Sequence, residues 1–245
     1  MVYVATGERF VREAMESAET VRRIMPELPI VLFADVKPPA GVFDDVLPVE
    51  NPQHAFIDKI EPLTRSPFDR TLFLDTDTFV IEPCGDLFDL LDHFDLAASH
   101  EPGRLQYPIR MVPDAFVEFN TGVIAYRRSE AVSRFFRTWR RFYQRDWERN
   151  LKVGKKPYDQ ISFTQVLYRS VLRIYVLSPE YNFRTVFPQS PAGKVRIVHG
   201  RGFSKRDFAA LNANTAPRLF CPNPKDWLRG LKASCGAMYN KIRSR

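Results

Sequence analysis

Two aspartates, Asp75 and Asp77, stand one residue apart at the end of an apolar run at positions 72–74. A run that is apolar at every position is typical of a strand buried on both faces. Two carboxylates this close repel each other unless water or a shared cation offsets their charge, and carboxylate oxygens are the ligands that hard divalent cations prefer. Ligands of open α/β sheets collect at the carboxyl ends of strands. The spacing therefore predicts a divalent metal site at the end of a central strand.

The elements that must position this pair begin with an alternation of strand and helix over the first hundred residues. Short apolar runs are separated by longer segments with apolar residues at helical spacing. This alternation predicts an α/β fold with a mixed, mostly parallel central sheet flanked by helices. The expected strands are 2–5, 30–34, 71–74 and 96–99, and the expected helices are 8–24, 55–63 and 86–91.

A long helix is expected in the second half of the chain. Ser129 can cap its N-terminus, and apolar residues recur on one stripe until about Arg149. Arginines lie mostly off this stripe, so we expect them to form a solvated basic face. The other expected elements are loops over 102–113 and 151–156, strands over 116–126, 173–177 and 195–198, and a helix over 157–168.

The C-terminal segment differs in composition from the rest. Residues 1–215 are expected to form a single catalytic domain, followed by a basic, proline-rich tail over 216–245 with a helix around Trp227. Such a helix can dock on its own domain or contact anionic lipid at the membrane periphery. The sequence leaves both roles open.

The composition narrows the class of protein. The chain has 245 residues and a net charge of +7, which favours an anionic partner. No nucleic-acid-binding motif accompanies the charge, so nucleic acid is not the expected partner. Three widely spaced cysteines indicate neither a disulfide framework nor a zinc site. No apolar run reaches the roughly 20 residues that span a bilayer, and no leader pattern is visible, so a cytoplasmic protein, at most peripheral to a membrane, is expected.

The segment Asp75-Thr76-Asp77 resembles the DxD motif of GT-A glycosyltransferases. The resemblance extends over about residues 1–205 to the retaining nucleotide-sugar transferases related to glycogenin and to bacterial lipopolysaccharide sugar transferases. It implies a GT-A fold and a hexosyltransferase-like enzyme that uses a UDP-sugar, Mn²⁺ or Mg²⁺, and a saccharide, lipid-linked or protein acceptor. The motifs that carry it, in order, are Ala5-Thr6-Gly7, Phe73-Leu74-Asp75-Thr76-Asp77-Thr78, Phe119-Asn120-Thr121-Gly122-Val123, Tyr158-Asp159-Gln160 and Val198-His199-Gly200.

The same resemblance implies roles for individual residues. His199 matches the third metal ligand beside Asp75 and Asp77, and an imidazole ligand suits Mn²⁺ better than Mg²⁺. Asn120, Asp159 and Gln160 are expected at the reacting sugar; a hairpin turn for Asn120 and helix capping by Asp159 are the structural alternatives. The residues expected to hold the nucleotide, diphosphate or donor sugar are Ala5, Thr6, Gly7, Asp35, Lys59, Asp75, Thr76, Arg201 and Lys205.

The sequence departs from this family after His199. The usual lysine-proline-tryptophan ending is replaced by residues 200–205, where Arg201 and Lys205 are the basic side chains.

Two other functions stay open. A phosphatase of the haloacid-dehalogenase type would use Asp75 as nucleophile and Asp77 as acid and base, although Phe79 stands where that family has Thr or Val. A non-catalytic relative would bind an acidic glycan or a membrane through its basic face.

Overall fold

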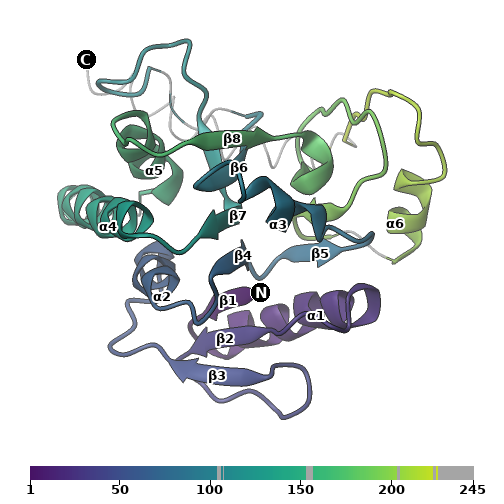
Figure 1. The fold of residues 1–245 in the computed structure, drawn as a ribbon, viewed down its shortest axis with the longest axis horizontal. Coiled ribbons are helices and arrows are strands. Elements are labelled where there is room, and N and C mark those ends of the chain that lie inside the picture. Colours follow the sequence, from purple (N-terminus) through teal and green to yellow (C-terminus); the bar gives the residue numbers. More distant parts are fainter. Residues whose placement is uncertain (104–105, 107, 153–156, 203–204, 223–224, 226–245) are drawn as a thin grey trace.

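Seven strands form one central sheet (Figure 1). The computed structural model describes residues 1–103, 106, 108–152, 157–202, 205–222 and 225. The strands are β1 (Val2–Ala5), β2 (Val31–Ala34), β3 (Asp45–Pro48), β4 (Arg70–Leu74), β6 (Leu96–His100), β7 (Phe119–Arg127) and β8 (Ile174–Leu177). Their order in the sheet is β3-β2-β1-β4-β7-β6-β8. β7 is antiparallel to its neighbours β4 and β6, whereas the other pairs are parallel, which confirms the expected mixed, mostly parallel sheet.

Helices cover both faces of this sheet (Figure 1). α1 (Glu8–Ile24) and α3 (Asp86–Leu90) share one apolar cluster with the strands, and α2 (Ile60–Thr64), α4 (Glu130–Leu151) and α5 (Asp159–Tyr168) share another. Successive residues of β1 show the division, because Tyr3 packs in the α1 cluster and Val2 in the α4 cluster. A strand covered on both faces is expected to be apolar at every position, as β1 and β2 are.

The long helix α4 begins where the sequence predicts. The Ser129 hydroxyl accepts a hydrogen bond from the Val132 backbone N–H at 3.2 Å, which caps the helix. Trp139 and Tyr143 on its apolar stripe are fully buried. Arginines on the opposite face, such as Arg141, are exposed, so the expected basic face is confirmed.

A second, smaller sheet lies beside the first. It contains β5 (Thr78–Val80), β10 (Ile197–His199) and β9 (Phe183–Arg184), in that order, with β10 antiparallel to β5. Phe208 of α6 (Lys205–Leu211) packs in the apolar cluster of this sheet. The sequence predicted β10 but not β5, β9 or α6, because strands of two or three residues are too short to show a periodic pattern.

Other differences from the expected elements are small. The helix expected over 55–63 is a 3₁₀ turn, η1 (Phe56–Lys59), followed by α2. The unpredicted edge strand β3 is mostly exposed and contains aspartate and proline, which are rare in strands. A second 3₁₀ turn, η2 (Pro179–Tyr181), precedes β9. The helix expected around Trp227 lies outside the described residues, and its membrane contact stays a prediction.

Among the helices of the described part of the chain, none is both long and apolar enough to cross a bilayer.

Candidate active site

Strand topology brings distant parts of the chain to the end of β4. Because β7 runs antiparallel to β4, the first residues of β7 lie beside the last residues of β4, and the Asp75 N–H donates to the Gly122 carbonyl at 2.8 Å. β10 pairs antiparallel with β5 and places His199 opposite Thr78. The Gly200 N–H then donates to the Asp77 carbonyl at 2.9 Å. The two sheets therefore join at the Asp75-Thr76-Asp77 segment.

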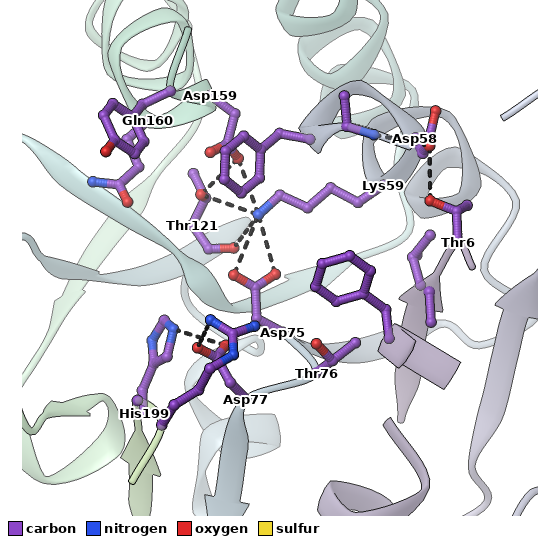
Figure 2. Close-up of a pocket in the computed structure, with 18 of the residues that line it drawn as sticks. Thr6, Asp58, Lys59, Asp75, Thr76, Asp77, Thr121, Asp159, Gln160 and His199 are labelled. Carbon is purple, nitrogen blue, oxygen red and sulfur yellow. Dashed lines mark hydrogen bonds and ion pairs between the residues drawn. The ribbon is translucent and has the colours of Figure 1, made fainter. Parts of the chain in front are cut away.

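The three predicted metal ligands meet at this junction. One ligand atom from each of Asp75, Asp77 and His199 lies within 4.8 Å of the others, and His199 Nε2 is 3.4 Å from Asp77 Oδ1 (Figure 2). Two carboxylates and one imidazole form a donor set that suits Mn²⁺ and accommodates Mg²⁺ less well. The residues present therefore fit a divalent cation.

Gly122 makes room for the imidazole of His199. A Cβ atom at position 122 would lie 2.1 Å from His199 Cε1, which is too close for two atoms that are not bonded to each other. The glycine at position 122 therefore allows close approach. The group that approaches is the metal-ligand candidate His199.

We expect Gly122→Ala to push His199 away from Asp77. Moving one ligand out of a three-ligand site should weaken Mn²⁺ binding about tenfold to a hundredfold. An Mn²⁺ titration, monitored by electron paramagnetic resonance, measures this loss of affinity. Gly85→Ala is the matched control, because a Cβ there meets nothing within 4 Å. Equal Mn²⁺ affinity in the two variants would contradict the packing argument.

Lys59 is a buried cation between two of the carboxylates (Figure 2). Its Nζ lies 3.1 Å from Asp75 Oδ1 and 3.0 Å from Asp159 Oδ2, and it donates to both Thr121 oxygens at 3.2 Å. Burial by itself lowers the pKa of Lys59, but the two carboxylates outweigh burial and the pKa is raised. Lys59 therefore stays charged and neutralises part of the negative charge in the site.

Asp159 and Gln160 open α5 and line the same cavity as the metal ligands. Tyr158, not Asp159, occupies the helix-capping position. The Asp159 carboxylate instead accepts a hydrogen bond from Thr121 Oγ1 at 2.7 Å, in addition to its ion pair with Lys59. Helix capping therefore does not explain Asp159, which leaves its expected role at the donor sugar as a prediction.

Asn120 lies inside β7 and not in a hairpin turn. Its Oδ1 accepts from the Gly122 N–H at 2.9 Å and from Asn182 Nδ2 at 2.8 Å, and its Nδ2 donates to Glu101 and Gln160. It is 1% exposed and does not line the cavity. The structure thus places Asn120 behind the wall of the site, where it can hold other side chains in position.

A buried polar network surrounds Asn120, and sequence reasoning missed most of it. Glu101 is fully buried and accepts from Asn120 Nδ2 at 2.6 Å and from Gln160 Nε2 at 3.2 Å. The buried Glu118 accepts from Gln160 Nε2 at 3.4 Å, and Arg184 lies 3.8 Å from Glu101. These residues carry no motif, and their partners are distant in sequence, so spacing offered no signal for them.

Arg201 lies at the entrance to the metal site. Its Nη1 is 3.0 Å from Asp77 Oδ2, while Nε and Nη2 bond Glu13 at 3.0 and 2.8 Å. Burial alone would raise the pKa of Asp77, but the guanidinium charges of Arg201 and Arg184 help to hold it below its usual range. The Lys205 side chain lies outside the described residues, so its expected phosphate contact stays a prediction.

Some of the residues expected to hold the nucleotide line the cavity, and others do not. Ala5, Thr6 and Thr76 line the cavity, and Thr6 Oγ1 donates to Asp58 Oδ2 at 2.9 Å (Figure 2). Gly7 has a positive φ of 89° and donates its N–H to Asp35 Oδ1 at 2.8 Å. Gly7 and Asp35 are not part of the cavity wall, so Asp35 shapes the turn after β1.

The cavity has a volume of about 730 Å³, which suits a ligand of nucleotide-sugar size. Its floor carries the metal ligands, Lys59 and the α5 N-terminus. Aromatic rings complete the lining, and Phe56 and Tyr158 are partly exposed with their ring centres 6.2 Å apart. The site therefore combines charged groups in its depth with apolar rings among its walls.

The comparisons with known proteins bear on the fold. No protein-family model matches the sequence, and no curated protein matches it. Among solved structures, the chain is similar to the galactosyltransferase LgtC, crystallised in complex with donor and acceptor sugar analogues. The TM-score is 0.53 and the identity 16%, over 96% of this chain and 95% of that one. The chain has the GT-A fold. The expected fold is therefore confirmed, and the Asp75-Thr76-Asp77 segment directly follows β4.

Proposed function

We propose that this GT-A protein is a metal-dependent glycosyltransferase that transfers a sugar from a nucleotide-diphosphate donor, a UDP-sugar, with retention of configuration. The acceptor is a saccharide, a lipid-linked group or a protein. One observation carries the proposal: Asp75, Asp77 and His199 converge on the floor of a cavity of nucleotide-sugar size. The similarity to a galactosyltransferase solved with donor and acceptor sugar analogues supports it.

The reaction places negative charge on the leaving diphosphate. A cation held by Asp75, Asp77 and His199 would supply Lewis-acid stabilisation of that charge. Arg201 is an additional cation at this position, because its Nη1 contacts Asp77. Two of its nitrogens are bound to Glu13, so the guanidinium stays at the site when Asp77 binds a metal instead. Its third nitrogen can then bind a phosphate oxygen.

The donor sugar would lie against Asp159 and Gln160. Gln160 Nε2 donates to the two glutamates behind it, Glu101 and Glu118, and its carbonyl oxygen accepts from Asn120 Nδ2. The second lone pair of that oxygen is the one that sugar hydroxyls would meet. Lys59 and Thr121 hold the Asp159 carboxylate in place. Catalysis would thus consist of positioning and electrostatic stabilisation, with front-face attack by the acceptor and the leaving phosphate as base.

Slow hydrolysis of the donor tests this function without a known acceptor. We expect release of UDP from at least one UDP-sugar in Mn²⁺ and none in EDTA, measured with UDP-glucose, UDP-galactose and UDP-N-acetylglucosamine. Formation of a phosphoenzyme on Asp75, or release of inorganic phosphate from a phosphomonoester, would support the phosphatase alternative instead. The GT-A fold supports the transferase over that alternative.

A further inference from the structure

Both ring nitrogens of His199 have defined neighbours. Nδ1 is 2.8 Å from Asn182 Oδ1, and Nε2 is 3.1 Å from Arg184 Nη1 and 3.4 Å from Asp77 Oδ1. A neutral imidazole carries its proton on one nitrogen and a lone pair on the other. A metal can bind only the nitrogen with the lone pair, so these neighbours decide whether His199 can act as a ligand from Nε2.

The orientation of the Asn182 amide is fixed by a chain of hydrogen bonds that starts at the backbone. The Gly122 N–H can only donate, so the atom it meets at 2.9 Å must be the oxygen of Asn120. The Nδ2 of Asn120 correspondingly donates to Glu101, which as a carboxylate only accepts. Reversing the Asn120 amide would oppose both contacts.

The hydrogen bond to Asn120 fixes the orientation of the Asn182 side-chain amide. Its Nδ2 donates to Asn120 Oδ1 at 2.8 Å, which turns Oδ1 toward His199. That oxygen has no hydrogen, so the proton of the bond must sit on His199 Nδ1. Both asparagines are almost fully buried, at 1% and 2% exposed, so water does not compete for these bonds.

Arg184 supports the same assignment independently. Its guanidinium can only donate, and its Nη1 lies nearer to Nε2, at 3.1 Å, than to Nδ1, at 3.4 Å. A proton on Nε2 would place two donors against each other. Asp77 favours that proton, but its Oδ1 lies farther from Nε2, at 3.4 Å, than Arg184 Nη1 does. A cation that binds Nε2 would take the lone pair that Arg184 now meets, so the guanidinium would turn toward Glu101, which lies 3.8 Å from its Nη2.

We propose that Asn182 is a positioning residue that holds His199 in the tautomer protonated on Nδ1, so that the Nε2 lone pair faces Asp77 and binds the divalent cation. This inference rests on the proposed function for its use of a metal. The tautomer itself is a property of the metal-free protein. Carbonyl partners of this kind typically contribute tenfold to a hundredfold to metal affinity.

The first experiment observes the tautomer directly. The chain has only four histidines, so two-bond proton–nitrogen NMR spectra of protein labelled with ¹⁵N-histidine are simple, and His199→Gln assigns the signal. We expect His199 to be protonated on Nδ1 in the metal-free wild type. Asn182→Leu, which keeps the volume but removes the acceptor, should give a mixture or the opposite tautomer. A wild-type His199 protonated on Nε2 would overturn the proposal.

The second experiment measures Mn²⁺ affinity in the presence of UDP by electron paramagnetic resonance. Asn182→Leu should bind Mn²⁺ about tenfold to a hundredfold more weakly than wild type. Asn212→Leu is the matched control, because Asn212 bonds both backbone groups of Val195 beside the same sheet and lies away from the ligands. Wild-type affinity in Asn182→Leu, or an equal loss in both variants, would overturn the proposal. A wild type without Mn²⁺ affinity but with the expected tautomer would contradict the proposed function and the metal-binding half of this proposal, and would leave the tautomer assignment supported.

Discussion

Asp77→Ala should reduce the kcat of metal-dependent donor turnover by at least about a hundredfold. Asp77 contributes a carboxylate to the three-ligand cluster and also meets Arg201 at 3.0 Å, so one substitution removes a proposed metal ligand and one of the two carboxylates that hold Arg201. The measurement is UDP release from the preferred UDP-sugar at saturating Mn²⁺.

The control for this prediction is Asp69→Ala. Its side chain is 94% exposed and has one loose ion pair with Arg128 at 3.6 Å, so its loss should leave turnover within about twofold of wild type. The melting temperature of both variants shows whether they are folded. Near-normal turnover in a folded Asp77→Ala protein would rule out this metal site.

Lys59→Met should produce the largest loss of stability. The substitution keeps most of the side-chain volume but leaves Asp75 and Asp159 without the cation that lies 3.1 and 3.0 Å from them. Breaking a buried ion pair from one side costs about 3–5 kcal/mol. For a chain of this length that corresponds to a drop in melting temperature of roughly 6–20 °C. Thermal unfolding followed by circular dichroism in EDTA checks the value.

Lys194→Met is the control that separates the effect of burial from the effect of losing a charge. Lys194 pairs with Glu82 at 3.1 Å but is 56% exposed, against 7% for Lys59. Exposed pairs contribute about 0–1 kcal/mol, so Lys194→Met should move the melting temperature by only a few degrees. Similar melting temperatures for the two variants would show that Lys59 does not stabilise the two carboxylates.

The fold and the proximity of Asp75 to Asp77 at a strand end could be predicted because both follow from local patterns. Apolar runs mark strands that are covered on both faces, and Asp75 and Asp77 sit at the end of one of them. His199 could be placed only by the order of motifs, since its strand has three residues and pairs with another of the same length. The roles of Glu101 and Asn182 could not be predicted, because each depends on hydrogen bonds between segments far apart in the sequence.

Residue roles were harder to predict than residue positions. Asp159 at the start of a helix was consistent with capping, yet its partner is Lys59, a hundred residues earlier in the chain. Asn120, two residues before a glycine, was consistent with a turn. It lies instead within the nine-residue strand β7, which pairs with β6 along one edge and with β4 along the other. In both cases tertiary contacts decide a role that local sequence leaves open.

The central claim is that Asp75, Asp77 and His199 hold a cation that binds a nucleotide diphosphate. A thermal-shift panel with UDP, GDP, ADP and CMP, each with and without Mn²⁺, on wild type and Asp77→Ala, tests it most directly. At about a hundred times the Kd, a ligand stabilises the native state by roughly 2.7 kcal/mol, or about 5–10 °C here. We expect that shift in wild type with UDP and Mn²⁺ together, and not in Asp77→Ala. No shift with any nucleotide, or a UDP shift that is equal without Mn²⁺ and in the variant, would contradict the account.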